Sequence, residues 1–468
     1  MLKFENYSIE ILKKYIPVIE KSPLNVNDVS TGSFFMWHEG VNLAFCTTED
    51  GSFVSRQDVS GEVAFSYPFG GDTKAATEEI LAYCRENDIP LKFYGVSDEL
   101  LQTLKSNPNF DKISYAFDRK WSDYIYDFEE MRQFAGKKFG GQRNHIHKFD
   151  ALYPTAEFSP LVKADLPKVR EFLIAYHAEH SVANLEENDE FRHTVELAER
   201  FDELGLIGGK FTLDGKVISF TIGEIQGDTL IIHIEKALKS VTGAYPATFN
   251  SFVKYVGEHY NGLKFVNRED DSGDPGLRTS KLQYNPIKLV NKNIVKINSP
   301  YAGVEIPEIT GEKVILSEIR ESDKADYLAL CIDDENNKYW GYDYKTDENI
   351  TSAVDENTFY DIANFDRAVG DSINFAVRDK QTGKLIGETI TYNATVNKKA
   401  ETGCRIAGEY AGQGKGSEAF ALTADFAESL GLRPTAKCYK QNEASRKMIL
   451  ACGFRFIRED DTFYYFSR

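Results

Sequence analysis

The sequence predicts a mixed α/β (α+β) fold arranged as three successive units. Segments with apolar residues at helical spacing alternate with short β-rich runs along all 468 residues. A chain of this length exceeds one core at about 150 residues per domain. A stretch at 292–310 lacks helical periodicity and contains Pro300, Gly303 and Pro307. We therefore expect domains at 1–150, 151–295 and 308–468.

Composition narrows the class of protein. The formal net charge is −18 and 42% of the residues are hydrophobic, which is typical of a globular protein with an acidic surface. Such a surface repels phosphate backbones, so general nucleic-acid binding is not expected. The first residues mix charged with apolar side chains, and runs of about 18 apolar residues are absent, so we expect no leader, no membrane span and a cytoplasmic location. The six cysteines form no C-x-x-C pair and are expected to be free thiols.

The first two units show helices, hairpins and single strands in turn. A helix is expected over 8–19, a hairpin at Asp50-Gly51, and a helix followed by a strand over 73–95. The second unit is expected to begin near Ala156. Its predicted elements are a helix in 161–181, three strands in 206–237 with a turn at Asp214-Gly215, a helix in 248–260 and a strand in 263–270.

The last unit repeats this order. A strand near Val314 leads to a predicted N-cap at Ser322 and a helix. Strands on either side of Thr382-Gly383 precede a third strand over 400–410. A helix then buries one face, and a strand over 435–439 leads to a short final helix. Apolar residues of the first of these helices are Ala419, Leu422, Phe426 and Leu430, and Gly431 and Gly453 close the two helices.

A cluster of three glycines, Gly412, Gly414 and Gly416, joins a predicted strand to a helix N-terminus. Free N–H groups at such a junction, with the helix dipole behind them, make an anion site. The sequence does not fit the Walker template, because Gly416 follows Lys415 where Ser or Thr is needed. The G-x-G-x-G spacing does not fit the dinucleotide fingerprint either. A tight turn that binds nothing is the alternative reading.

The glycines, together with N-x-x-S before a helix that ends in C-G-F, resemble the GNAT superfamily of acetyl-CoA-dependent acyltransferases over about 311–466. The closest likeness is to its ribosomal-protein-type N-acetyltransferases. The resemblance implies that the loop holds the pyrophosphate of acetyl-CoA and that Asn442 contacts the pantetheine arm. The family's usual Arg or Gln is replaced here by Ala411. The implied cofactor-binding residues are Ala411, Gly412, Gln413, Gly414, Lys415, Gly416, Ser417 and Asn442.

Acyl transfer to an amine needs a base for the amine and a proton for the leaving thiolate. Since no histidine follows His259, we take Glu401 as the candidate base, with a solvated strand carboxylate as the alternative. Ser445 and Tyr439 are the candidate acids. Asn442 also has the plain reading of an N-cap. Glu418 is expected to form an ion pair on the helix surface.

Two charged segments mark the first 300 residues. The run 137–148 carries Lys137, Lys138, Arg143 and two histidines, which suggests an anionic ligand or a solvated helix face. The histidines have no convincing metal partner, so no metal is expected. The segment 266–286 places charges around a strand end, which indicates a binding site or a self-satisfied ion-pair network. Period two would put His233 and Glu235 on one face of a further strand.

Three ordered motifs, GKKFGGQRNHIHKF, HIEKALKSVTGAYPATF and NREDDSGDPGLRTSKLQYNP, resemble the phosphatidylglycerol lysyltransferase C-terminal-domain family over about 1–292. That family has tandem GNAT-like folds, and its characterised members transfer an aminoacyl group from charged tRNA. The resemblance therefore implies three GNAT-like units in this chain, each a mostly antiparallel sheet flanked by helices. The implied site residues, without fixed roles, are Lys137, Lys138, Arg143, His233, Glu235, Lys236, Arg268, Glu269, Arg278 and Lys281.

These observations predict an acetyl-CoA-dependent N-acetyltransferase, fused to a lysyltransferase-like acyltransferase module. Its acceptor is expected to be a primary amine on a small molecule or peptide. One alternative is an aminoacyltransferase that uses charged tRNA, with the last domain accessory. Another is an N-terminal module that captures an anionic ligand without catalysis. The sequence names neither the acceptor nor the oligomeric state.

Overall fold

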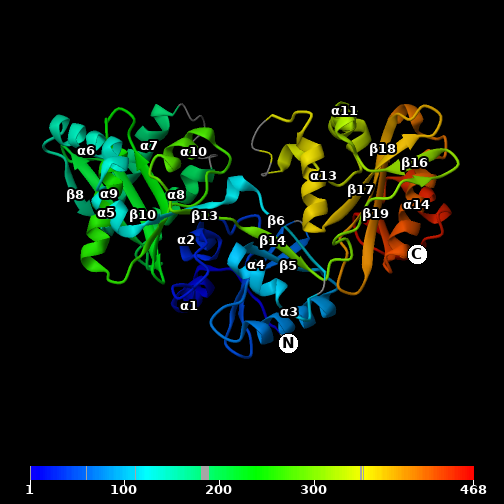
Figure 1. The fold of residues 1–468 in the computed structure, drawn as a ribbon, viewed down its shortest axis with the longest axis horizontal. Helices are drawn as coiled ribbons and strands as arrows, with labels where there is room; N and C mark the ends of the chain where they lie inside the picture. The colour runs from blue at the N-terminus through cyan, green and yellow to red at the C-terminus, as the bar shows by residue number, and fades with distance from the viewer. Residues whose placement is uncertain (1, 60, 111, 181–188, 348–349, 351–352) are drawn as a thin grey trace. The chain divides into compact units, whose positions relative to one another are not determined.

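Three β-sheets with flanking helices organise the chain, which confirms the predicted mixed α/β class (Figure 1). The computed structural model describes residues 2–59, 61–110, 112–180, 189–347, 350 and 353–468. Ser181, at the end of one predicted helix, lies outside them. Two compact units are distinguished: 1–79 with 94–100 and 117–293, and 80–93 with 101–116 and 294–468. Within the described segments, every helix is too short or too polar to cross a membrane.

The first sheet has the order β1-β2-β3-β4-β5-β14-β6. The hairpin predicted at Asp50-Gly51 joins β2 to β3, and the predicted helix and strand over 73–95 are α3 and β5. Its strands are β1 (Glu5–Asn6), β2 (Ala44–Thr47), β3 (Phe53–Val59), β4 (Glu62–Ser66), β5 (Leu91–Val96), β6 (Ile113–Ala116) and β14 (Asn293–Ile297). The helices are α1 (Ile9–Ile19), which is the helix expected over 8–19 and is capped by Ser8, α2 (Thr31–Met36), α3 (Thr73–Asn87) and α4 (Asp98–Lys105).

The second sheet has the order β13-β7-β12-β11-β10-β9-β8. Its strands are β7 (Asp123–Asp127), β8 (Glu157–Pro160), β9 (Ile207–Leu213), β10 (Lys216–Gln226), β11 (Thr229–Ala237), β12 (Phe265–Asn267) and β13 (Lys288–Val290). The helices are α5 (Phe128–Gln133), α6 (Gly140–Leu152), α7 (Leu166–Glu179), α8 (Asp189–Arg200), α9 (Ala244–His259) and α10 (Pro275–Leu282). Helix α9 packs on this sheet through Phe249, Phe252 and Val253.

The sheets do not follow the predicted boundary at residue 150. That residue lies inside α6, and the second sheet already contains β7 from before it. The first sheet in turn takes β14 from beyond the second sheet. Such exchanges depend on pairing between distant strands, which local periodicity does not record.

The third sheet has the order β15-β16-β17-β18-β19-β20-β22-β21. Its strands are β15 (Ile309–Thr310), β16 (Val314–Ser317), β17 (Ser372–Asp379), β18 (Leu385–Tyr392), β19 (Lys399–Ile406), β20 (Arg433–Tyr439), β21 (Arg455–Glu459) and β22 (Phe463–Ser467). The helices are α11 (Lys324–Ile332), α12 (Asp334–Asn337), α13 (Thr358–Val369), α14 (Lys415–Ser429) and α15 (Glu443–Ala451). The predicted hairpin at Thr382-Gly383 and the predicted α14 face are present.

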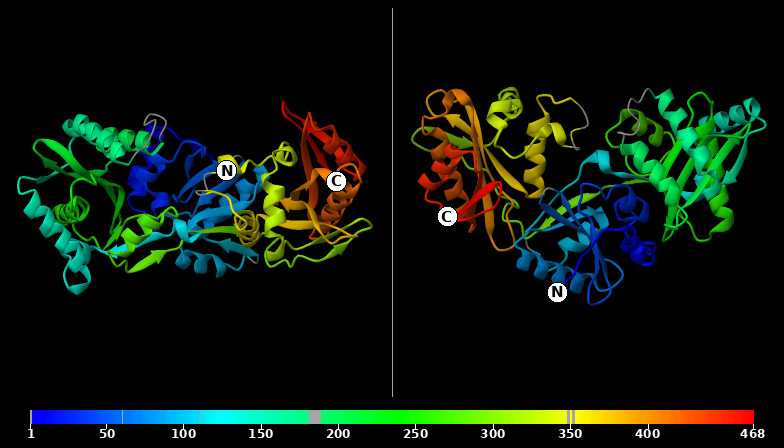
Figure 2. Two further views of the ribbon diagram at one scale, coloured as in Figure 1. Left: turned by 90° about the horizontal axis from the view of Figure 1, so that it is seen from above. Right: turned by 180° about the vertical axis from the view of Figure 1, so that it is seen from behind.

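Alternation along the strands assigns the two faces of this sheet. Ala400 and Ile406 of β19 pack with Phe426 of α14. Ala376 of β17 packs instead in a cluster with residues of α11 and α13. Helices lie on both sides of this sheet in Figure 2. The predicted N-cap at Ser322 is wrong: Ser322 lies in a short 3-10 turn, and Asp323 precedes α11. The Asp323 carboxylate does not cap α11; it accepts from the Arg320 N–H and binds Arg378.

Candidate functional site

Each of the three glycines at the start of α14, two before the helix and Gly416 within its first turn, has a local structural reason. Gly412 and Gly414 adopt φ of +74° and +77°, a region that side chains with a Cβ rarely occupy. A Cβ on Gly416 would lie 3.2 Å from Ile406, which leaves little room. A Cβ on Gly412, by contrast, would meet no protein atom within 4 Å. The glycines therefore build the turn, and the space beside Gly412 is open.

The N-terminus of the helix that follows this loop lacks a side-chain cap. Gly414 occupies the N-cap position, and among the described residues no side chain accepts a hydrogen bond from the N–H groups of the first turn. The first N–H groups of a helix have no partner within the helix. This end of α14 therefore presents unused donors and the positive end of a helix dipole, which suit an anion.

The corresponding strand–loop–helix connections in the other two sheets hold carboxylates of the protein itself. Between β4 and α3, the Asp72 N–H donates to the Asp50 carboxylate, which also accepts from Ser52. Between β11 and α9, the Lys239 N–H donates to Glu179 at 2.6 Å, and the Ser240 hydroxyl donates to the same carboxylate. An internal anion thus occupies each of these two loops.

A wedge opens between β19 and β20 beside the glycine loop. These parallel strands pair over three residues, from Lys399 opposite Arg433 to Glu401 opposite Thr435. Beyond Glu401, β19 continues for five residues to Ile406 without pairing to β20. At about 3.3 Å per residue the unpaired stretch measures about 17 Å. The wedge therefore runs from a vertex at Glu401 to the glycine loop.

A similar wedge in the second sheet is bridged by side chains. Parallel β11 and β12 pair only from Thr229 to Ile231. Beyond that point His233 of β11 binds Glu269 at 2.8 Å, and Glu235 of β11 binds Arg268 at 2.9 and 3.0 Å. These two ion pairs join β11 to the segment after β12, so the wedge is closed.

Glu401 lies at the vertex of the open wedge and is already engaged. Its carboxylate accepts from the Tyr392 hydroxyl and forms an ion pair of 3.4 Å with Lys437. Tyr392 is its direct neighbour on β18, and Lys437 lies two residues beyond the paired Thr435. Register and alternation place all four side chains on the face opposite α14.

The two candidate acids lie farther from the vertex, Tyr439 at the end of β20 and Ser445 in α15. Tyr439 ends the strand four residues after Thr435, about 13 Å along it. The Asn442 side chain accepts from the Ser445 N–H at 3.1 Å and caps α15, as its plain reading predicts. The Tyr439 ring lies 5.7 Å from the ring of Tyr339. The structure gathers Tyr439, Asn442 and Ser445 at one end of β20, away from Glu401.

Side chains around the glycine loop differ from the sequence expectations. Lys415 forms an ion pair with Asp379, which lowers the pKa of the Asp379 carboxyl to about 2. The positive charge of Lys415 is therefore balanced by the Asp379 carboxylate. The surface ion pair expected for Glu418 is wrong, because its carboxylate accepts from the N–H groups of residues 312–314. Lys313 was not among the predicted residues, yet its Nζ donates to the Gln413 carbonyl at 3.0 Å.

A buried ion pair behind β19 was also missed by the sequence reasoning. Arg405 donates to Glu388, and both side chains are almost completely buried. Glu388 also accepts from the Tyr327 hydroxyl and from Asn374. The Arg405 guanidinium lies 4.5 Å from the Trp340 ring centre. This network fixes β18 and β19 against α11, and only the alternation of charged residues on two neighbouring strands hinted at it.

In the N-terminal module His233 is held between two carboxylates. It lies at a bulge of β11, where the register to β10 shifts, and binds Glu224 at 2.9 Å as well as Glu269. Burial lowers the pKa of His233, but the hydrogen bonds to Glu224 and Glu269 outweigh it and raise the pKa to about 10. The ring packs so closely on Gly32 that a Cβ there would lie 2.4 Å away. Neither ring nitrogen is free to act as a base.

Arg268 is stacked between aromatic rings. Its guanidinium lies 4.5 Å from the ring of Phe249 and 4.4 Å from that of Tyr284, while Glu235 binds one edge. The Nη1 group has no hydrogen-bond partner within the described residues. Lys236 points to the opposite side of β11, where it pairs with Glu190 over the Tyr176 ring.

The remaining predicted residues of this module make protein contacts of their own. Lys281 donates to the carbonyls of Arg268 and Asp270, and burial lowers its pKa. Arg278 binds Asp271 in two places, at 2.8 and 2.9 Å. These contacts stabilise the turn after β12.

The basic run 137–148 is not gathered into one site. Arg143 donates to the carbonyls of Phe134 and Gly136, and Lys138 pairs with Glu130. Lys137 is exposed, as are both histidines of the run. The reading as a solvated helix face fits this arrangement better than a single anion site.

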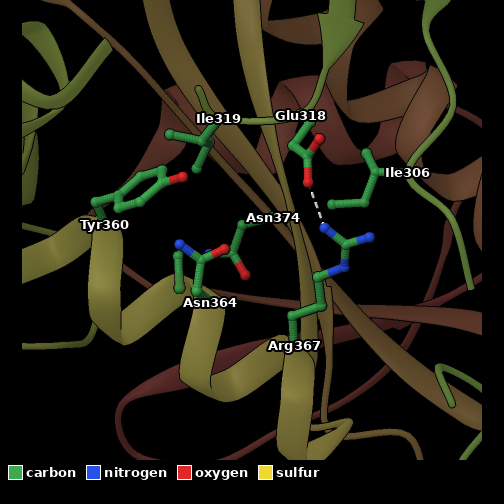
Figure 3. A pocket seen from close by; sticks show the side chains of 8 residues that line it. Ile306, Glu318, Ile319, Tyr360, Asn364, Arg367 and Asn374 are labelled. Carbon is green, nitrogen blue, oxygen red and sulfur yellow. Dashed lines mark hydrogen bonds and ion pairs between the residues drawn. The ribbon is translucent and has the colours of Figure 1, made fainter. Parts of the chain in front are cut away.

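Two cavities lie away from all predicted residues. A cavity of about 10 Å³ beside α13 has room for about one water molecule, and the Glu318–Arg367 ion pair lines it (Figure 3). An open groove of about 560 Å³ lies in the compact unit formed by 1–79, 94–100 and 117–293. Its lining residues are Glu20, Lys21, Gly205, Ile207, Ile225, Gly227 and Tyr260.

Two families match this chain, one in its N-terminal part and one in its C-terminal part. Residues 22–296 match the family described as phosphatidylglycerol lysyltransferase, C-terminal. The chain belongs to this family. Residues 313–455 match the acetyltransferase (GNAT) domain family, so this lysyltransferase-family chain also carries a GNAT domain. It is an acyltransferase-type fusion, and both predicted resemblances are confirmed.

Individual relatives are distant. An uncharacterized protein of Mycoplasmoides gallisepticum is 22% identical over 179 residues, which span 38% of this chain and 56% of that protein. A conserved protein of unknown function from Bacteroides thetaiotaomicron is 26% identical, covers 64% of this chain and 100% of its own, and superposes with a TM-score of 0.58. L-PGS from Bacillus licheniformis is 15% identical over 62% of this chain and 92% of its own, with a TM-score of 0.45.

Proposed function

We propose that the C-terminal domain is an acetyl-CoA-dependent N-acetyltransferase that acts on a primary amine. The observation that carries this proposal is the loop before α14. Of the three connections that correspond in the three sheets, those before α3 and α9 hold Asp50 and Glu179, whereas among the described residues no carboxylate accepts from the start of α14. Its free donors and the open space at Gly412 fit a pyrophosphate.

The open wedge fits the rest of the cosubstrate. Unpaired backbone groups of β19 between Glu401 and Ile406 can bond an extended pantetheine arm, as an added strand would. Bound acetyl-CoA supplies an activated acetyl group as a thioester. With the pyrophosphate at the glycine loop, the arm directs that group toward the vertex.

In this proposal Glu401, at the vertex, holds the acceptor. Its carboxylate can take the proton that the amine loses, directly or through a water. Tyr392 and Lys437 orient it. Ser445 and Tyr439 stay predictions for the thiolate proton, with Tyr439 some 13 Å along β20 from the vertex. The acceptor is a small molecule or peptide with a primary amine.

The N-terminal module supports a second candidate function, with a donor other than CoA. Both of its loops hold internal carboxylates, and ion pairs of His233 and Glu235 bridge its wedge. Family membership favours aminoacyl transfer from charged tRNA. The many internal contacts of the predicted site residues favour the rival reading, an anion-binding scaffold. Turnover that depends on charged tRNA would support the first, and ligand binding without turnover the second.

The test is calorimetric titration of acetyl-CoA into the full chain and two variants at Gly412. Asn and Asp both tolerate positive φ, so Gly412→Asn and Gly412→Asp should fold alike. They differ by one negative charge at the open side of the loop. We expect the Asn variant to bind within a few-fold of wild type and the Asp variant to lose at least about tenfold in affinity.

Circular dichroism checks that both variants are folded. Equal binding by the two variants would place the pyrophosphate elsewhere. Absence of binding to the folded wild type would refute the acetyl-CoA proposal itself.

A further inference from the structure

Lys313 reaches over the glycine loop from the start of β16. Its Nζ donates to the Gln413 carbonyl at 3.0 Å and would lie 2.7 Å from a Cβ on Gly414. The side chain is exposed, and within the described residues no carboxylate pairs with its ammonium group. An exposed ammonium gains more from a charged acceptor than from a neutral carbonyl, so the group is free to take an anionic partner.

The other residues near the loop do not supply this charge. Ala411 has no side chain that reaches a ligand. The ammonium of Lys415 is engaged by Asp379 and lies over the Tyr410 ring. Glu418 is the nearby anion, but its carboxylate is occupied by three N–H groups, including that of Lys313. Among the residues that the structure describes, Lys313 is therefore a cation beside the loop that no carboxylate engages.

We propose that Lys313 binds the diphosphate of CoA and supplies the charge that Ala411 lacks. This inference rests on the proposed acetyl-CoA function and adds a residue from a distant strand to it. Lys313 lies 98 positions before Ala411 in the sequence, and this contact brings it to the diphosphate at the glycine loop. Lysine suits this role as a mobile point charge on a flexible stem.

The test measures binding of CoA and dephospho-CoA by calorimetry to the full chain. Dephospho-CoA keeps the diphosphate and lacks the 3′-phosphate. Lys313→Met is expected to weaken both ligands by about three- to tenfold and to make the affinity less dependent on salt. Lys313→Arg should stay within about twofold of wild type.

Lys380→Met is the matched control. The Nζ of Lys380 also donates to a backbone carbonyl, but to that of Gly311, which lies outside the glycine loop, at 2.7 Å. This variant removes the same charge and is expected to bind CoA as wild type does. Equal binding by wild type and Lys313→Met would overturn the inference while leaving the proposed function intact. A loss seen with CoA but not with dephospho-CoA would move Lys313 to the 3′-phosphate and also overturn it. If the wild type binds neither ligand, the proposed function fails first.

Discussion

Lys292 offers the sharpest test of the forces that stabilise the first compact unit, which is formed by 1–79, 94–100 and 117–293. Its side chain is 5% exposed, and its Nζ lies 2.9 Å from Asp28 and 3.1 Å from both Asp123 and Asp270. The Asn27 side-chain oxygen accepts from it at 2.7 Å. Lys292→Met removes one cation and leaves three carboxylates around an apolar side chain. Breaking a buried ion pair from one side costs about 3–5 kcal/mol of unfolding free energy.

The cost should depend on pH in a defined direction. Burial raises the pKa of Asp123 to about 6 even with Lys292 present, above the value of about 3.9 in an unfolded chain. A raised carboxyl pKa favours folding below the unfolded value, and that contribution is lost as pH rises through the folded value. Without Lys292 the carboxylates repel one another unscreened. The deficit of the variant should therefore be largest near pH 7.5 and smaller at pH 5.5.

Urea denaturation at these two pH values measures the effect. Trp37 and Trp121 lie in the first unit and report its unfolding by fluorescence. The double variant Lys292→Met with Asp123→Asn is the control, and it should recover part of the loss because one buried charge is removed with its partner. A deficit below about 1 kcal/mol at pH 7.5, or one equal at both pH values, would refute this account.

Three further outcomes are expected. Calorimetry should find one CoA site per chain, and a stoichiometry of two or three would show that the loops holding Asp50 and Glu179 also bind it. Glu401→Gln should lower kcat with an identified amine acceptor by about 100-fold or more and leave acetyl-CoA affinity unchanged, and an unaltered kcat would remove Glu401 from the chemistry. His233 should remain protonated at pH 8.5 in imidazole NMR spectra, because its pKa is raised to about 10. Its stabilising contribution should be complete below about pH 6.5 and fade as pH rises through 10, whereas titration near 6.5 would contradict the double ion pair.

The local features of the fold were readable because they depend on neighbouring residues. Periodicity predicted α14 and its buried face, and Asp50-Gly51 predicted a hairpin. The glycine cluster predicted a tight strand-to-helix connection, and in the structure Gly412 and Gly414 adopt positive φ there. The N-cap prediction at Ser322 was wrong because a short 3-10 turn over Glu321–Asp323 precedes α11, and the pairing of Asp323 with Arg378, 55 positions later, is not visible in local sequence.

The candidate site divides in the same way. The glycine loop and Glu401 could be named from the sequence, since a loop before a helix and a charged strand residue are local patterns. Lys313 could not, because its approach to Gln413 requires β16 and α14 to meet through Glu418. The charges listed for the N-terminal module were identifiable, but their partners were not.

The sequence by itself determined the mixed α/β class, the two family resemblances and the glycine turn, all of which depend on residue type and short spacing. Tertiary structure decided which anion sites are open. Asp50 and Glu179 fill two loops from outside them, and ion pairs of His233 and Glu235 close one wedge while the wedge at Glu401 stays open. The reason is physical: a donor or a charge is available only if no distant residue has been folded onto it, and that depends on pairing across the whole unit.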